Sequence, residues 1–185
     1  FIAAFILLML VGRWPATKAW LAGIIRWRVG FQWYAVALLL PPALTATAVG
    51  LDLMLGANLL VGFRHIEWLD LVPRFVFILL WIGLGEEPAW RGYALPRLLD
   101  GRSALSASLL LGALHAIWHA PLFGVEYDIR SVWPWGISVF CYAITVTWIW
   151  LHSERSLLLP MLMHTSNNTA AFVWGMFGAD DQIRL

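Results

Sequence analysis

Six long apolar stretches dominate this sequence of 185 residues and limit what it can fold into. Helices of about 20 apolar residues are needed to cross the ~30 Å hydrocarbon core of a bilayer, and all but the first stretch have about that length. The hydrophobic fraction of 61% and the mean hydropathy of +0.76 exclude a water-soluble domain. The sequence therefore predicts a multi-span integral membrane protein with spans at residues 1–12, 31–51, 72–92, 103–121, 132–151 and 156–178.

The apolar stretches favour helices over a transmembrane barrel. Barrel strands alternate apolar and polar residues in segments of about ten, whereas these stretches are continuously apolar. We therefore predict an all-α, polytopic transmembrane helical bundle of about six spans, in which residues 1–12 are the tail of a truncated first span. Without an internal repeat or a linker, residues 1–185 are expected to form one domain, with its motif-bearing core at about 72–175.

The charges are few and nearly balanced. Twelve Lys and Arg against eleven Asp and Glu give a net charge of +1, and no block of like charge is present, so a nucleic-acid partner is not expected. The loop after the first stretch is rich in basic residues and lacks acids, which predicts a cytoplasmic position for it. We expect a multi-pass protein of the plasma membrane, with lipid as its surroundings; the sequence leaves the oligomeric state open.

The stretch at 103–121 carries a small residue at every fourth position. Small side chains allow two helices to approach closely in lipid, where apolar burial gives no net drive for association. The pattern predicts a central, closely packed helix with His115 and His119 beside the packing seam. The small residues are Ala104, Ser108, Gly112, Ala116 and Ala120.

Ionisable and amide side chains inside the stretches gather in three places. Left facing lipid, the three charges of the first group alone would cost about 7–10 kcal/mol on insertion scales, so they are expected to face inward. The groups are Glu86, Glu87 and Arg91; His115 and His119; and His164 with Asn167 and Asn168.

The spacing within each group predicts how the side chains meet. Glu87 and Arg91 are four residues apart on one helix face and suit an ion pair, whereas Glu86 is rotated by about 100° and left available. His115 and His119 share the same spacing, as do His164 and Asn168. We predict that three helices bring these groups to one inner cavity; the alternative is that they serve only as polar contacts between helices.

At these residues the sequence resembles the CPBP family of intramembrane peptidases, which includes the type II CAAX prenyl endopeptidases and the bacterial Abi proteins. Residues 85–98, GEEPAWRGYALPRL, look like the family's EExxxR motif. Residues 112–121, GALHAIWHAP, are similar to its histidine motif, with His119 at the motif position and His115 where Phe or Trp is usual. Residues 164–168, HTSNN, look like HxxxN. Pro88, after the two glutamates, is a second departure and is expected to kink the helix.

The resemblance implies an intramembrane endopeptidase that cleaves a peptide bond of a membrane-associated, prenylated or unprenylated, peptide or protein. It implies that Glu86 and His119 activate a water molecule and that His164 and Asn168 stabilise the oxyanion. Arg91 then holds Glu87 in place, and His115 is a further supporting residue. Peptide hydrolysis needs such an activated water and such oxyanion donors.

Three alternatives remain at this point. Glu86, His119 and His164 form a set of the kind that binds one zinc ion, with Glu87 as the proton acceptor, although no cofactor is required by the sequence. Carboxylate and histidine side chains across spans also occur in ion-coupled transporters. The resemblance also extends to non-catalytic bacteriocin-immunity or scaffold membrane proteins.

Overall fold

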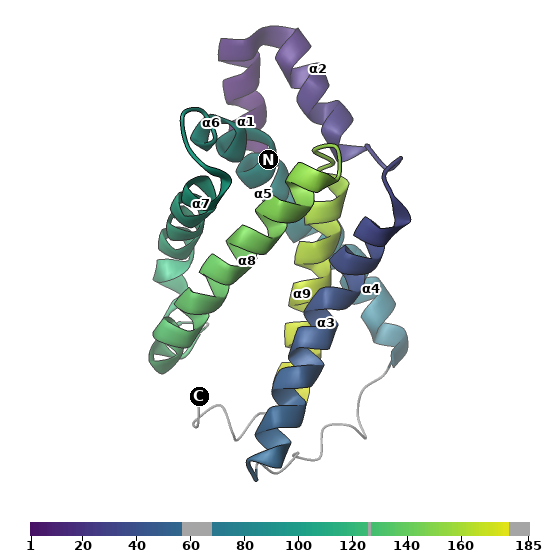
Figure 1. Cartoon of the computed structure of the whole chain (residues 1–185), viewed down its shortest axis with the longest axis vertical. Helices are drawn as coiled ribbons and strands as arrows, with labels where there is room; N and C mark the ends of the chain where they lie inside the picture. The colour runs from purple at the N-terminus through teal and green to yellow at the C-terminus, as the bar shows by residue number, and fades with distance from the viewer. Residues whose placement is uncertain (57–67, 126, 178–185) are drawn as a thin grey trace.

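The computed structural model describes residues 1–56, 68–125 and 127–177, and these form helices joined by short connections (Figure 1). Within this part of the chain there is no β-sheet, so the predicted all-α bundle is confirmed. The α-helices are α1 (Ile2–Leu7), α2 (Arg13–Ile24), α3 (Phe31–Met54), α4 (Trp68–Ile78), α5 (Leu84–Glu87), α6 (Leu95–Leu98), α7 (Ala104–His119), α8 (Val132–His152) and α9 (Leu158–Phe177).

Four helical segments are long and apolar enough to cross a membrane: Ile2–Ile24, Phe31–Met54, Ala104–Leu122 and Ile129–His152. The predicted spans 72–92 and 156–178 are helical too, but they do not meet this measure of length and apolarity. These two segments carry Glu86, Glu87, Arg91 and His164. Glu87, Arg91 and His164 are buried among neighbouring helices, and a buried position tolerates a polarity that a lipid-facing one does not.

The first segment is not one straight span. Arg13 has φ 55°, an unfavourable value for a non-glycine residue, and it separates α1 with its π-helical continuation Leu8–Gly12 from α2. Figure 1 shows the two arms meeting at the top of the molecule. The region that the sequence placed in a basic loop is therefore largely helical, because Thr17 and Trp20 of α2 are buried against the bundle.

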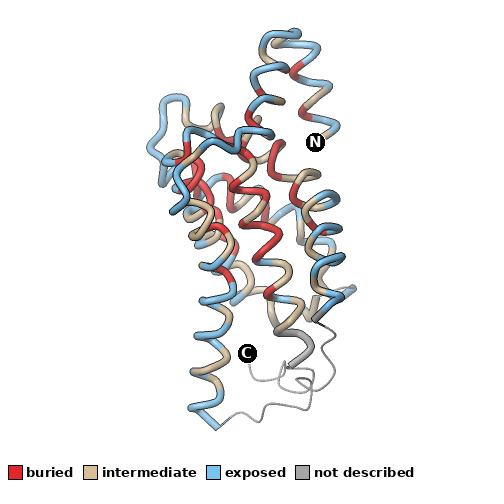
Figure 2. The backbone as a smooth tube through the Cα atoms, turned by 90° about the vertical axis from the view of Figure 1, so that its right-hand side faces the viewer, coloured by how far each residue is buried: buried red, intermediate tan, exposed pale blue. Residues whose placement is uncertain are grey.

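Helix α9 is the centre of the bundle. It contacts α3, α4, α5 and α8 and lies between α8 and α3 in Figure 1. The buried stretches in Figure 2 lie on the helices in the middle of the molecule, whereas the outer helices are largely exposed. The apolar core between α3, α8 and α9 consists of Ala37, Val146, Ile149, Leu159 and Met163.

Helix α3 runs unbroken through Pro41 and Pro42. Pro42 lacks the N–H that would bond the Leu38 carbonyl, and the hydroxyl of Ser166 on α9 donates to that carbonyl instead, at 2.8 Å. The prolines therefore create a polar contact between α3 and α9 rather than a broken helix.

The small-residue stripe packs α7 against α8. A Cβ at Gly112 would lie 2.9 Å from Cδ1 of Phe140 and 3.3 Å from Cβ of Ala143, so only glycine permits this approach. Ser108 is buried at the same seam, whereas Ala104 and Ala120 at the two ends are exposed. The predicted close packing is confirmed, but the expectation of a central helix here is wrong, since α7 forms an outer pair with α8 and α9 is central.

Residues 68–98 form one helical segment that contains two π-helical turns, Leu79–Gly83 and Pro88–Ala94. Pro88 opens the second of them, where its missing N–H leaves the preceding turn without one bond. The carbonyl of Pro88 accepts a hydrogen bond from the Trp20 indole at 2.8 Å. A Cβ at Gly92 would lie 2.5 Å from that indole nitrogen, so glycine is required here.

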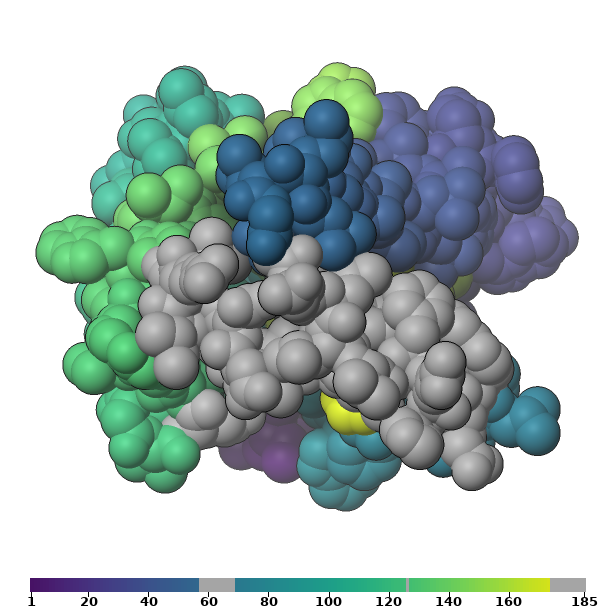
Figure 3. Space-filling view, turned by 90° about the horizontal axis from the view of Figure 1, so that it is seen from below, coloured from purple at the N-terminus to yellow at the C-terminus, as the bar shows by residue number. Residues whose placement is uncertain are grey.

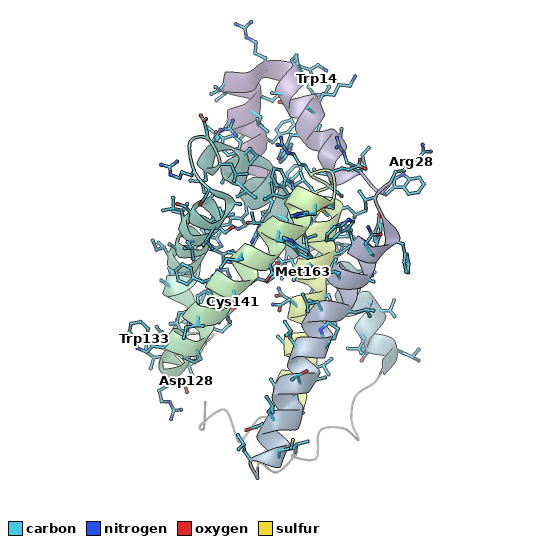
Figure 4. The ribbon with its side chains drawn as sticks, viewed as in Figure 1. Trp14, Arg28, Asp128, Trp133, Cys141 and Met163 are labelled. Atoms are coloured by element: carbon cyan, nitrogen blue, oxygen red, sulfur yellow. The ribbon has the colours of Figure 1, made fainter. Side chains whose placement is uncertain are left out.

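The two ends of the molecule carry exposed tryptophans and charged residues. Figure 4 places Trp14 near one end and Trp133 with Asp128 near the other, as is typical of side chains at membrane interfaces. Hydrogen bonds from the Arg130 side chain and backbone hold the pKa of Asp128 below its usual value. Figure 3 shows the molecule from below, where the end of α3 forms the dark-blue surface near the centre.

Candidate active site

The carboxylate of Glu87 joins two helices at the middle of the bundle. Its Oε1 accepts hydrogen bonds from Nη1 of Arg91 at 2.9 Å and from Nδ1 of His164 on α9 at 2.7 Å. Glu87 and Arg91 are both 0% exposed, and His164 is 6% exposed. The predicted ion pair is therefore confirmed, and it is stabilised by a third residue that the spacing along one helix did not predict.

The contact with Glu87 fixes the chemical state of the His164 ring. A carboxylate oxygen only accepts hydrogen bonds unless it is protonated, so Nδ1 of His164 carries the proton. The other ring nitrogen, Nε2, makes no hydrogen bond among the described residues. His164 is therefore an imidazole with one nitrogen held by a buried carboxylate and the other available to a ligand.

A second set of rings adjoins this group. The His115 ring stacks on Trp90, with centroids 5.4 Å apart, and on His119, with centroids 4.6 Å apart. Its distance from the His164 ring is 6.3 Å. The histidines of α7 and α9 are thus brought together with Glu87, as predicted. The stack also explains why an imidazole replaces the usual aromatic residue at position 115, since it keeps the stacked geometry.

His119 has the same ring state as His164 but a different partner. Its Nδ1 lies 3.1 Å from the carbonyl oxygen of His115, which can only accept, so Nδ1 carries the proton, and Nε2 makes no hydrogen bond within the described part of the chain. On its other side the ring contacts Trp135 of α8, at 5.3 Å between centroids. The two histidines therefore differ in the partner of Nδ1: a neutral carbonyl for His119 and a carboxylate for His164.

Glu86 lies beside Glu87 in sequence but outside the buried group of Glu87, Arg91 and His164. It is partly exposed, and its Oε2 lies 3.4 Å from the indole nitrogen of Trp90, a long hydrogen bond. Within the described residues no hydrogen bond joins Glu86 to His119. Trp90 connects them indirectly. Its indole nitrogen contacts Glu86, and its ring stacks on His115, which in turn stacks on His119.

The amides of α9 are less engaged than predicted. Asn168 is partly buried and Asn167 is exposed, and no hydrogen bond to either side chain is found in the described part of the chain. Asn168 follows His164 by one helical turn, so both lie along one side of α9. The side chain is placed near the histidine without a partner of its own.

The described residues do not form a metal-binding group. No three His, Cys, Asp or Glu side chains among them are arranged to hold an ion. Glu87 binds Nδ1 of His164, which is the contact that metal-ligating histidines commonly make with a carboxylate, and Nε2 remains available. The zinc set of Glu86, His119 and His164 therefore stays a prediction.

Sequence reasoning missed Tyr142 of α8. Its ring makes an edge contact with His164 at 5.7 Å between centroids, and the Arg91 guanidinium lies 5.4 Å from its centroid. Tyrosine usually lies at the membrane interface, so a tyrosine ten residues inside the predicted span 132–151 was the available signal.

Both a protein family and an individual protein are similar to this chain. A family model described as "Type II CAAX prenyl endopeptidase Rce1-like" matches residues 68–170, which is more than half of the chain and includes all three motifs. The CAAX prenyl protease 2 of Methanococcus maripaludis is 32% identical over 143 residues, covering 70% of this chain and 52% of that protein. The chain thus spans about half the length of this relative.

Proposed function

The chain belongs to the Rce1-like family of type II CAAX prenyl endopeptidases, and on this premise we propose that the cluster around Glu87 is the site of an intramembrane endopeptidase of the CAAX-processing type. Its substrate is a membrane-associated, prenylated peptide or protein, the class named by the curated relative. The observation that carries the proposal is the state of His119 and His164. Each has Nδ1 engaged and Nε2 free within one polar cluster of an otherwise apolar bundle.

The different partners of the two histidines support different roles. The carboxylate of Glu87 stabilises a positive charge on His164, so this ring suits the donor that faces a developing oxyanion. The carbonyl partner of His119 orients the ring without a compensating charge, so its neutral Nε2 suits the acceptor of a proton. This division agrees with the roles implied by the family motifs.

The reaction begins with a water molecule held by Glu86 and Nε2 of His119. As the water oxygen attacks the scissile carbonyl carbon, its proton passes to one of these two groups, and the carbonyl electrons move onto the oxygen. Glu86 is suited to this step because its carboxylate is partly exposed and lies outside the ion pair that fixes Glu87.

The attack leaves a negative charge on the former carbonyl oxygen of the substrate. A doubly protonated His164 ring, its charge balanced by Glu87, donates from Nε2–H, and Asn168 donates from its amide N–H; donors aimed at such an oxyanion typically contribute about 3 kcal/mol each. The intermediate collapses as the C–N bond breaks, and the proton taken from water passes to the leaving amine. Arg91 and Glu87 hold His164 in place and do not touch the substrate.

The test compares peptide cleavage by the full-length protein and by matched variants in detergent or nanodiscs. Glu86→Gln is expected to lower kcat by about 10²–10⁴-fold. Glu154→Gln, the same change at an exposed loop acid, is the control and is expected to leave cleavage unchanged. A Glu86→Gln protein that cleaves at the normal rate would refute the assignment, and an intact protein that cleaves no peptide would favour a scaffold or immunity role.

Two further arms sharpen the proposal. A farnesylated peptide and its unprenylated counterpart, compared by kcat/KM, show whether the lipid is part of the recognised substrate. A chelator tests the zinc alternative, and loss of cleavage that added zinc restores would favour it. We place the protein in the plasma membrane, which fractionation of cells that express it tests directly.

A further inference from the structure

Tyr142 lies next to the Glu87 group but has no place in the family motifs. It precedes Ala143 on α8 and follows Cys141, whose side chain is exposed (Figure 4). Because consecutive helical residues are about 100° apart, Tyr142 turns inward where Cys141 faces out. Its ring contacts both residues that bond to Oε1 of Glu87, namely His164 and Arg91.

Two oxygen atoms at this contact are buried without a hydrogen-bond partner among the described residues: the Tyr142 hydroxyl and Oε2 of Glu87. The hydroxyl is close enough to interact with the Glu87 carboxylate. One of these atoms is a donor and the other is an acceptor, so each supplies what the other lacks. Buried polar groups in proteins are nearly always hydrogen-bonded, directly or through water, so we expect these two oxygen atoms to be hydrogen-bonded as well.

We propose that Tyr142 is a positioning residue of the peptidase site. Its hydroxyl donates a hydrogen bond to Oε2 of Glu87, directly or through one water molecule. With Arg91 and His164 on Oε1, both carboxylate oxygens are then held, and the carboxylate cannot rotate away from Nδ1 of His164. The proposal rests on the proposed function, since it explains how His164 keeps Nε2 directed at the substrate.

The experiment removes one hydroxyl group and keeps the ring. Tyr142→Phe is expected to lower kcat about tenfold while KM changes little, because the substrate does not touch this group. The matched control is Thr147→Val, which removes another buried, unpartnered hydroxyl from the same helix and is expected to leave kcat unchanged.

A second measurement does not depend on cleavage. In protein with ¹⁵N-labelled histidine, the ring resonances of His164 report which nitrogen carries the proton and how strongly it is hydrogen-bonded. Tyr142→Phe is expected to shift these resonances, and Thr147→Val is expected to leave them in place. Replacement of Tyr142 by 3-fluorotyrosine, a stronger donor of nearly the same shape, is expected to shift them in the opposite direction.

The results separate the two proposals. A Tyr142→Phe protein that matches Thr147→Val in both kcat and the His164 resonances overturns the role of Tyr142. If the wild-type protein cleaves no peptide, the proposed function fails, and the histidine resonances still decide whether Tyr142 acts on His164. If Tyr142→Phe does not fold, the fluorotyrosine protein decides: unchanged resonances reject the proposal.

Discussion

The two adjacent glutamates of this protein lie in opposite surroundings. Glu87 is fully buried and bonds to Arg91 and His164 at 2.9 and 2.7 Å, whereas Glu86 is partly exposed and accepts a long hydrogen bond from Trp90 at 3.4 Å. We call the surroundings of Glu87, which join α5 to α9, the sealed region. We call the surroundings of Glu86, which adjoin the stacked rings of α7, the open region.

The comparison shows how a helical bundle can hold a buried charge and still leave a second carboxylate accessible. A buried ion pair is stable only when its partners remain together, so the sealed region is rigid by necessity. A carboxylate that takes part in chemistry must be able to exchange partners, which the open region permits. We infer that the sealed region positions the histidine and the open region carries out the proton transfer.

The sharpest test of this comparison exchanges each carboxylate for an amide. Glu87→Gln leaves the Arg91 guanidinium buried without a counter-charge and is expected to cost about 3–5 kcal/mol of stability. Glu86→Gln, the adjacent change, is expected to alter stability by less than about 0.5 kcal/mol. Thermal unfolding in detergent, followed by tryptophan fluorescence, measures both; equal losses of stability would show that the two regions do not differ.

The next effect concerns the packing that supports the sealed region. Gly92→Ala places a methyl group against the Trp20 indole and is expected to cost about 1–3 kcal/mol through overpacking. Gly136→Ala is the control, because nothing lies within 4 Å of the new Cβ. If both variants unfold at the wild-type temperature, the indole of Trp20 does not constrain this helix.

Much of the site could be predicted from the sequence because polar side chains are rare and costly inside membrane-spanning segments. A charged side chain inside such a segment needs a partner. The pairing of Glu87 with Arg91 and the approach of the histidines therefore followed from the four-residue spacing and from the free-energy cost of placing charge in lipid. The helical class followed from the apolar stretches in the same way. The three motifs and their order along the chain then indicated which of these polar residues are candidates for chemistry.

Other features depended on contacts between segments that are distant in sequence. The bond from His164 to Glu87 crosses 77 positions, and no periodicity within one helix indicates it. The π-helical turns around Glu86 change how its side chain is directed, and a sequence pattern based on 3.6 residues per turn does not detect them. The central place of α9 rather than α7 is likewise set by packing.

A smaller effect is expected where α9 is joined to α3. Ser166→Ala removes the hydroxyl that serves the Leu38 carbonyl and leaves this carbonyl unpaired, at a cost of about 1 kcal/mol. Ser138→Ala is the matched control, since that hydroxyl is exposed and bonds the carbonyl of Trp135 in its own helix. Equal unfolding temperatures for the two variants would show that the contact does not stabilise the bundle.

The smallest effect is expected at His115, which distinguishes stacking from chemistry in the open region. Phenylalanine keeps a flat ring between Trp90 and His119, and the His115 side chain makes no hydrogen bond among the described residues. We therefore expect His115→Phe to change stability by less than about 0.5 kcal/mol and kcat by less than about threefold. His115→Ala removes the ring and is expected to lower kcat further, because His119 then lacks the surface that holds its plane. A large loss of cleavage in His115→Phe would instead show that the imidazole itself takes part in proton transfer, and the open region would then contain three reacting groups rather than two.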